Sequence, residues 1–239
     1  MASEINSYFD TIDNPRKAYW LGFLWCDGYV WYREKKNEYG VKLDLAIEDK
    51  SHLYKFKKDL NITTDIKEYK PYKNSFSGNN GVCRCSSYNR NLVKPLLYKY
   101  GITPHRTDVT KLLNNIPKEY ERDFIRGCLD ADGSFSCYQT KDKRWVVNKS
   151  NLMFGGTVEL LNYIYTHLKN NNIIQSSEMP KLYKRHKDRD GAYNELKLSG
   201  VRQNYNILSY IYQEGDLCLD RKYNKFQNYV KEGWYNERS

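Results

Sequence analysis

The sequence contains no run of about 18 apolar residues, which is close to the length that a helix needs to cross a bilayer. Residues 1–14 have neither the basic n-region nor the apolar h-region of a secretory signal. These absences predict a soluble, intracellular protein without a membrane partner, whether it acts in the cytoplasm, in an organelle or in a phage-infected cell.

The ligand spacings of structural zinc sites are also missing. The six cysteines form no CxxC pair, and the four histidines show no HxxxH spacing. We therefore expect reduced, mostly buried thiols and no structural zinc centre.

The composition excludes global disorder and leaves room for two domains. Of the 239 residues, 40% are hydrophobic and 15% are aromatic, so the chain can form a core despite its 28% charged residues. The length accommodates one large domain or two of about 100 residues each.

A net charge of +10 and a pI near 9.1 indicate an anionic partner. Lysine and arginine are spread over the whole chain, which suits a long groove for a phosphate backbone. Tyrosine, lysine, asparagine and isoleucine are all frequent, however, and an AT-rich genome would produce this composition whatever the function. The charge alone therefore leaves nucleic-acid binding and genome composition as competing explanations.

One nine-residue stretch occurs twice. Residues 20–28, with the sequence WLGFLWCDG, reappear in altered form at residues 125–133 as IRGCLDADG. The same pattern follows both copies: two strands, a helix, a hairpin of two strands and a further helix. The sequence therefore predicts two αββαββα repeats and an α+β fold.

The patterns place these elements along the chain. In the first repeat, residues 41–48 alternate like a strand, and residues 52–60 follow the pattern of a helix. The other predicted elements are strands at 65–70 and 82–86 around a turn at 77–81, a strand at 145–154, a helix at 158–169, and strands at 181–186 and 193–199 around a turn at 190–191.

A proline marks the junction of the repeats. Pro117 interrupts regular structure just before the helix that carries the second motif. We therefore expect an N-terminal extension at residues 1–17, a first repeat at 18–114 and a second repeat at 115–239.

The motif predicts close packing of two helices. Gly22 and Cys26, like Gly127 and Ala131, are four residues apart and share one helix face, which lets two helix backbones approach closely. If the two helices pack side by side, Asp27 and Asp132 meet at their ends. Two adjacent carboxylates repel unless a cation lies between them, and hard oxygen ligands suit Mg²⁺. The glycines that follow, Gly28 and Gly133, are expected in the left-handed turn that ends many helices.

A single such motif would usually be an ordinary helix end with a surface aspartate, but two copies in equivalent contexts favour a functional pair. Residues 127–133 resemble the LAGLIDADG motif of homing endonucleases of the monomeric, two-repeat type, and residues 22–28 resemble a degenerate copy. The similarity in motif and element order extends from about residue 18 to about residue 230.

The resemblance implies a fold and a reaction. It implies a saddle of two antiparallel sheets in the DNA major groove, with the motif helices at the interface between the repeats. The family cuts both strands across the minor groove and leaves short 3′ extensions. The last aspartate of each motif holds the metal, which here assigns Asp27 and Asp132. The expected cofactor is Mg²⁺, with Mn²⁺ able to substitute and Ca²⁺ binding without supporting cleavage.

The first copy departs from the pattern at Trp25, where the second has Asp130. This earlier aspartate is not the usual metal ligand, so the departure leaves both metal-binding carboxylates in place. The family also tends to place a basic residue near the end of each repeat. Matching residues 101–106 with 217–222 places Arg106 and Lys222 at these positions. There a cation can act in catalysis by stabilising the charge that develops on the phosphate. An equal alternative is that these residues only position the phosphate.

The strand patterns predict which residues face DNA. In the strands after the motifs, these are residues at even spacing from the aspartates: Trp31, Arg33, Lys35, Ser136, Tyr138 and Thr140. In the other strands the predicted core positions are Val41, Leu43, Leu45 and Ile47, and Cys83 and Cys85, which we match with Leu196 and Leu198. The residues that alternate with them are therefore expected to face outward: Lys42, Asp44, Arg84, Ser86, Lys197 and Ser199. The basic hairpin adds Lys181, Tyr183 and Arg185 as a backbone clamp or a solvated tip.

We therefore expect a metal-dependent, site-specific endonuclease that binds double-stranded DNA as a monomer. The outward positions differ between the repeats, so its target should be long and non-palindromic. The alternatives are an intron RNA maturase on the same fold, a DNA-binding regulator that does not cleave, and a basic structural protein. Retention of both aspartates argues against the regulator, and the repeat argues against the structural protein.

Overall fold

The computed structural model describes residues 7–70, 81–103, 109–142, 145–176, 178–184 and 193–236. The first half contains α1 (Pro15–Asp27), β1 (Gly28–Arg33), β2 (Glu38–Ala46), α2 (Lys50–Asp59), β3 (Lys67–Tyr69), β4 (Val82–Ser87), α3 (Arg90–Tyr98) and the short α4 (Val109–Leu113). The second half contains α5 (Glu121–Asp132), β5 (Ser134–Asp142), β6 (Trp145–Gly156), α6 (Val158–Asn170), β7 (Tyr183–Lys184), β8 (Asn194–Ser199), α7 (Val201–Ile211) and α8 (Asp220–Lys231). The predicted order αββαββα is confirmed in both halves.

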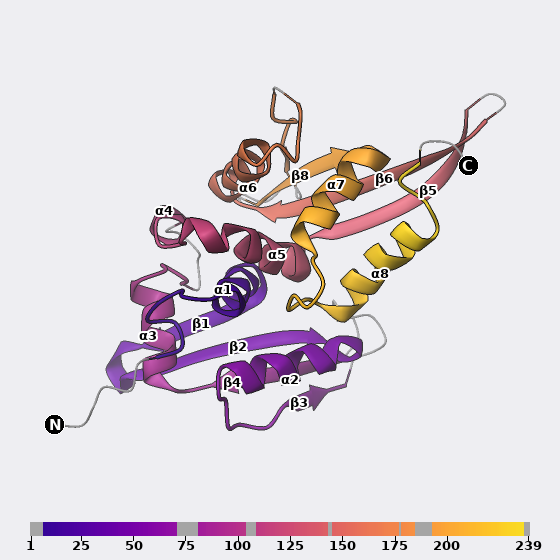
Figure 1. The fold of residues 1–239 in the computed structure, drawn as a ribbon. Coiled ribbons are helices and arrows are strands. Elements are labelled where there is room, and N and C mark those ends of the chain that lie inside the picture. Colours follow the sequence, from indigo (N-terminus) through magenta and orange to yellow (C-terminus); the bar gives the residue numbers. More distant parts are fainter. Residues whose placement is uncertain are drawn as a thin grey trace.

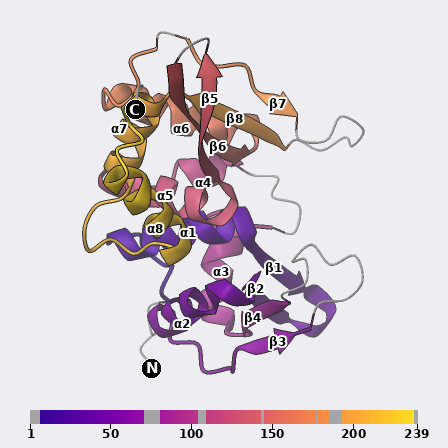
Figure 2. The ribbon, with the colours of Figure 1, turned by 90° about the vertical axis from the view of Figure 1, so that its right-hand side faces the viewer.

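Each half forms one four-stranded antiparallel sheet. The strand order is β1-β2-β4-β3 in the first half and β5-β6-β8-β7 in the second. Figures 1 and 2 show the halves one above the other, with α1 and α5 between them. The predicted α+β class is confirmed.

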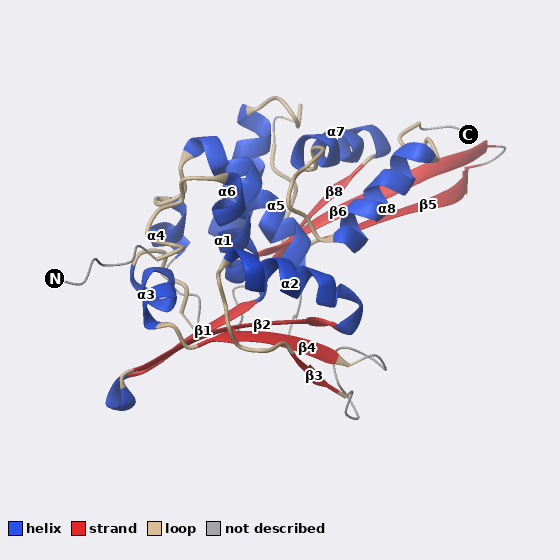
Figure 3. Ribbon diagram, turned by 60° about the horizontal axis from the view of Figure 1, so that its bottom comes forward, coloured by secondary structure: helices blue, strands red, loops and turns tan. Residues whose placement is uncertain are grey.

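Helices cover one face of each sheet. α2 and α3 pack on the first sheet, and α6 and α7 pack on the second (Figure 3). In β2, Val41, Leu43 and Leu45 are buried, while Lys42 and Asp44 between them are half-buried on the opposite face. The period of two in the sequence thus separates a core face from an outer face.

The two motif helices lie side by side. α1 begins where the Asn14 side chain accepts a hydrogen bond from the Lys17 amide at 3.0 Å and Pro15 occupies the first turn. A Cβ atom on Gly22 would lie 2.1 Å from the Phe124 carbonyl oxygen, and one on Gly127 would lie 2.1 Å from the Tyr19 carbonyl oxygen. The two glycines therefore allow each helix backbone to touch the other.

The cysteines of the interface are buried thiols. The Cys128 thiol on α5 donates to the carbonyl oxygen of Gly22 on α1 at 3.7 Å, and burial raises the pKa of Cys128. Ala131 is half-buried against the core. All six cysteines are free, and five of them are buried.

Several local predictions were wrong. Gly28 and Gly133 are extended, with φ of −76° and −81°, and not left-handed. Glycine is needed at both positions because the backbone here approaches the end of the preceding helix closely. A Cβ atom on Gly28 or Gly133 would lie within 2.7 Å of the carbonyl oxygen of Leu24 or Leu129, respectively. Lys35 lies in a short 3₁₀ turn, Glu34–Lys36, and not in a strand.

The strand that contains Val41 is also shorter than predicted. Ile47 lies in a second 3₁₀ turn, Ile47–Asp49, and is half-buried, so it is not a strand residue of the core. The match between the returning strands of the two halves differs from the predicted match by two residues. Cys85 pairs with Leu43, which in turn pairs with Gly28, the residue after the first motif aspartate. Leu196 pairs with Phe154, which follows Met153, the partner of Ser134. Cys85 therefore corresponds to Leu196, although all four predicted core positions are buried.

Within the described residues, no helix is both long enough and apolar enough to span a membrane.

Candidate active site

The two motif carboxylates stand at the ends of the paired helices. Asp27 is the last residue of α1 and is exposed, and Asp132 is the last residue of α5 and is half-buried. Lys222, on the first turn of α8, reaches this end of α5. Its Nζ donates hydrogen bonds to the carbonyl oxygens of Leu129 and Gly133, at 2.8 and 2.6 Å.

Lys222 links both carboxylates electrostatically. Burial lowers the pKa of Lys222, while the negative charges of Asp130, Asp132 and Asp27 act in the opposite direction. The charges of Asp27 and Asp132 therefore both act on the same half-buried ammonium group. One cation and the two carboxylates converge where the first half meets the second.

The Asp132 carboxylate also accepts a hydrogen bond from Tyr193. The tyrosine hydroxyl donates to Oδ2 of Asp132. A Cβ atom on Gly155 would lie 2.0 Å from the Tyr193 hydroxyl oxygen, so the absence of a side chain at Gly155 makes room for it. The sequence patterns did not single out Tyr193, because its contact joins residues that are far apart in the chain.

The donor set fits a hard divalent cation only in part. Among the described residues, no group of three or more His, Cys, Asp or Glu side chains is placed to hold a metal ion. Mg²⁺ commonly takes one or two protein carboxylates and completes its shell with water and substrate phosphate. Asp27 and Asp132 can supply these carboxylates, so the residues present fit an ion that is shared with a phosphodiester.

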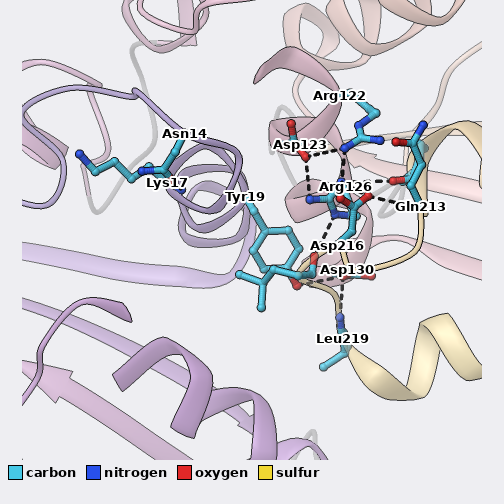
Figure 4. Close-up of polar contacts among 12 residues, drawn as sticks. Asn14, Lys17, Tyr19, Arg122, Asp123, Arg126, Asp130, Gln213, Asp216 and Leu219 are labelled. Carbon is cyan, nitrogen blue, oxygen red and sulfur yellow. Dashed lines mark hydrogen bonds and ion pairs between the residues drawn. The ribbon is translucent and has the colours of Figure 1, made fainter. Parts of the chain in front are cut away.

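Asp130, the earlier aspartate of the second motif, is buried and has a structural role. Its carboxylate accepts hydrogen bonds from the Tyr19 hydroxyl at 2.9 Å and the Leu219 amide at 2.7 Å (Figure 4). It also accepts one from the Tyr212 hydroxyl at 2.5 Å. Burial raises its pKa. Asp130 therefore joins α1, the end of α7 and the start of α8, from which Lys222 extends.

A second polar cluster lies beside Asp130. Arg126 is almost fully buried and forms ion pairs with Asp123 at 2.7 Å and Asp216 at 2.8 Å (Figure 4). It also donates to the carbonyl oxygens of Leu217, at 2.9 Å, and Ile211. This network holds the segment between α7 and α8 against α5.

The start of α8 also contacts the first half. Lys55 on α2 pairs with Asp220 at 2.6 Å, and Arg221 pairs with the buried Asp49 at 2.9 Å. We call these two ion pairs the α8 clasp. The clasp fixes the helix that carries Lys222 to both halves.

The outer face of the first sheet combines bases with aromatic rings. Lys42 lies over the Tyr29 ring at 5.0 Å, and Tyr29 stacks with Trp31. Arg84 forms two hydrogen bonds with Asp44, at 2.6 and 2.7 Å, and its guanidinium lies 4.8 Å from the Tyr69 ring centre. A hollow of about 220 Å³ on this face is lined by Trp31, Lys42, Thr64, Asp65, Lys67, Tyr69, Arg84, Ser86 and Tyr88.

The outer face of the second sheet is more polar. Lys197 pairs with Glu195 at 2.9 Å, and Ser199 donates to Asn151. The other predicted residues of this half are exposed or half-buried: Ser136, Tyr138, Thr140, Lys181 and Tyr183. On the first sheet, Arg33 is exposed and pairs with Glu38 at 3.3 Å, and Lys35 is exposed in its turn.

Two predicted residues, Arg106 and Arg185, lie outside the described residues. The sequence reasoning also omitted outward residues of both sheets, namely Tyr29, Lys67 and Lys149. Tyr29 stands at even spacing from Asp27, so the pattern could have found it. Lys149 is opposite Tyr138 in the sheet, a pairing that the sequence does not specify.

The chain is similar in fold to solved structures, although no protein-family model and no curated protein sequence matches it. A lysine-to-alanine variant of I-SmaMI has a TM-score of 0.59 at 14% identity, covering 91% of this chain and 90% of that one. The LAGLIDADG homing endonuclease I-GzeII in complex with its DNA target has 0.55 at 13%, covering 91% and 89%. The I-SmaMI LAGLIDADG homing endonuclease bound to cleaved DNA has 0.57 at 13%, covering 92% and 89%. The predicted fold of two repeats joined through the motif helices is thus confirmed.

Proposed function

We propose that this chain is a LAGLIDADG homing endonuclease, a site-specific, metal-dependent enzyme that cuts double-stranded DNA as a monomer inside cells. The proposal rests on the close packing of α1 and α5, each of which ends in an aspartate, Asp27 or Asp132, while Lys222 binds the end of α5. Two carboxylates and one ammonium group, shared between two halves, suit a reaction at two nearby phosphodiesters. The likeness in fold to endonucleases bound to DNA supports this reading.

In this proposal Asp27 and Asp132 bind divalent cations, each from the end of its own helix. Mg²⁺ held there would polarise the scissile phosphates and activate water for attack. Lys222 is held by two backbone carbonyl groups, so its ammonium is fixed before substrate arrives. A fixed cation stabilises negative charge on the phosphate without reorganisation. No side chain needs to act as a covalent nucleophile.

The outer faces of the two sheets would lie in the major groove, where side chains contact base edges and phosphates. Corresponding positions differ in chemistry: Lys42 matches Met153, Asp44 matches Gly155, and Arg84 matches Glu195. The two halves therefore present different donors and acceptors, and the target should be non-palindromic.

The experiment is cleavage of a genomic or randomised duplex library by the full chain with Mg²⁺, followed by sequencing of the new ends. We expect cuts at one long site with short 3′ extensions, and none from the Asp27→Asn variant. Tight duplex binding without cutting would instead support a regulator. Promotion of intron splicing, with no DNA cleavage, would support a maturase.

A further inference from the structure

The hydrogen bond between Tyr193 and Asp132 depends on three residues from different parts of the second half. Tyr193 immediately precedes β8, Gly155 lies on the neighbouring strand β6, and Asp132 ends α5. A Cβ atom on Gly155 would lie 2.0 Å from the tyrosine oxygen and 2.7 Å from its Cζ. The glycine therefore provides the space through which the hydroxyl reaches Oδ2 of Asp132.

The first half has different residues at the positions that correspond to Gly155 and Tyr193. Gly28 pairs with Leu43 and Ser134 pairs with Met153, so Asp44 and Gly155 occupy corresponding strand positions beside the motif carboxylates. Asp44 carries a side chain there, and it binds Arg84. By the same register Val82 corresponds to Tyr193, and a valine has no hydroxyl. A tyrosine hydrogen bond of this kind is thus not available to Asp27 from this position.

We propose that Tyr193 is a positioning residue for a divalent cation at Asp132, and that it makes the two metal positions of the protein inequivalent. This inference rests on the proposed function. The Tyr193 hydroxyl donates to Oδ2 and so restricts the rotation of the Asp132 carboxylate, which orients it toward the ion. Groups that orient a metal ligand in this way typically contribute about 10–100-fold to metal affinity. Val82 stands at the corresponding position of the first half, so we expect an ion at Asp27 to bind independently of Tyr193.

Lanthanide binding can test this without any cleavage assay. Tb³⁺ is a hard cation that prefers oxygen ligands, and nearby aromatic side chains sensitise its luminescence. Titration of the full-length Asp27→Asn variant with Tb³⁺ isolates the Asp132 position, and titration of the Asp132→Asn variant isolates the Asp27 position. We expect Tyr193→Phe to weaken Tb³⁺ binding about 10–100-fold in the first background and to leave it unchanged in the second.

Two further variants separate positioning from general damage. Gly155→Ala keeps the Tyr193 hydroxyl but places a methyl group in the space that this hydroxyl occupies. The variant should therefore reproduce the effect of Tyr193→Phe. Tyr54→Phe, at an exposed tyrosine of α2, is the matched control and should leave Tb³⁺ affinity unchanged in both backgrounds. Thermal unfolding of each variant establishes that it is folded.

The outcomes distinguish this inference from the function on which it rests. Equal weakening in both backgrounds, or no weakening by Tyr193→Phe, would overturn the positioning role while leaving a metal-dependent enzyme in place. Tb³⁺ binding that neither aspartate variant reduces would overturn both. With the cognate DNA, slower cutting of one strand only by Tyr193→Phe, seen as accumulation of a single nicked product, would give independent support.

Discussion

Arg84 on β4 and Asp44 on β2 face each other in the sheet and share two hydrogen bonds, from Nε to Oδ1 at 2.6 Å and from Nη2 to Oδ2 at 2.7 Å. The edge of the guanidinium group that would pair with a guanine is therefore already engaged by a carboxylate. The strand pattern predicts an outward Arg84, and the structure adds that its guanidinium group is paired with a carboxylate on that face.

We predict that Asp44→Asn releases Arg84 and raises the affinity for duplex DNA of any sequence. The variant gains one net positive charge on the outer face, so the dependence of binding on salt should steepen by about one in the slope of log K against log salt. Fluorescence anisotropy on target and scrambled duplexes measures this. Lys197→Ala is the opposite control, with a slope flatter by about one. An unchanged slope for both variants would place these sheet faces away from DNA.

The second prediction concerns the motif carboxylates. Asp27→Asn or Asp132→Asn should abolish double-strand cleavage, because each removes one of the two carboxylates that we propose as metal ligands, while DNA affinity stays largely intact. Cleavage and binding are measured on the same target. Lys58→Asn, at an exposed residue of α2, controls for the substitution itself. Full double-strand cutting by either aspartate variant would exclude these residues from catalysis.

The third prediction concerns the helix interface. Replacing Gly127 with leucine places a side chain where the Tyr19 carbonyl oxygen now lies, so the helices must separate. Overpacking of this kind typically costs about 1–3 kcal/mol, and more where backbone opposes backbone. Denaturant unfolding measures the loss, and Gly22→Leu should match it because Gly22 meets the Phe124 carbonyl in the same way. A variant as stable as the wild type would contradict the observed packing.

The fourth prediction concerns the buried charge of Arg126. Arg126→Met removes the buried partner of Asp123 and Asp216, which then keep only their longer pairs with Arg122, at 3.1 and 3.2 Å. We therefore expect a loss of about 3 kcal/mol, at the lower end of the range for a broken buried pair. Arg16→Met is the matched control. The Arg16 side chain is half exposed and pairs with Asp59 at 2.7 Å, a pair expected to contribute no more than about 1 kcal/mol. Similar losses for both variants would mean that burial of Arg126 has no energetic consequence.

The fifth prediction is a dependence of stability on pH. Burial lowers the pKa of His52 to about 3, with Lys55 acting in the same direction and Asp220 against it. The unfolded chain takes up this proton near pH 6.5 and the folded chain only near pH 3. The contribution of neutral His52 to the free energy of unfolding is therefore fully present above pH 6.5 and is lost as the pH falls toward 3. Between pH 7 and pH 5 this loss amounts to roughly 2 kcal/mol.

Comparison with His52→Gln isolates this contribution from other titrating groups. The glutamine can still donate to the Tyr19 hydroxyl, which accepts from His52 at 2.9 Å while it donates to Asp130. Unfolding free energies at pH 7 and pH 5 should fall by roughly 2 kcal/mol more in the wild type than in the variant. Parallel losses in both proteins would show that His52 protonates as easily in the folded state as in the unfolded one.

The fold was predictable because its signals are local and repeated. The alternation in residues 41–46, the helical patterns and the two motif copies each depend on neighbours in the sequence. The site was only partly predictable, because its geometry depends on contacts between distant residues. Asp130 binds Tyr19 and the Leu219 amide, and Lys222 is anchored by backbone carbonyls of α5; no spacing in the sequence encodes these pairs.

The errors also have physical causes. Gly28 was expected to be left-handed because many helices end in that way, but the chain continues directly into β1 in an extended conformation. The Arg84 and Asp44 pair was missed because the alternation of a strand predicts which face a residue occupies and not which residue lies opposite it. Strand register decides the partner, and in this sheet it places a carboxylate opposite the arginine.

The α8 clasp limits how this protein could be rebuilt from parts. Lys55 and Asp49 belong to the first half, and their partners Asp220 and Arg221 precede Lys222 by one or two residues. A chimaera that joins the second half to the first half of another protein would lose both ion pairs, even if the glycine faces of its central helices were compatible. A chimaera that keeps the second half should therefore retain residues 49–59 of the first half, or carry an aspartate and a lysine at the positions of Asp49 and Lys55.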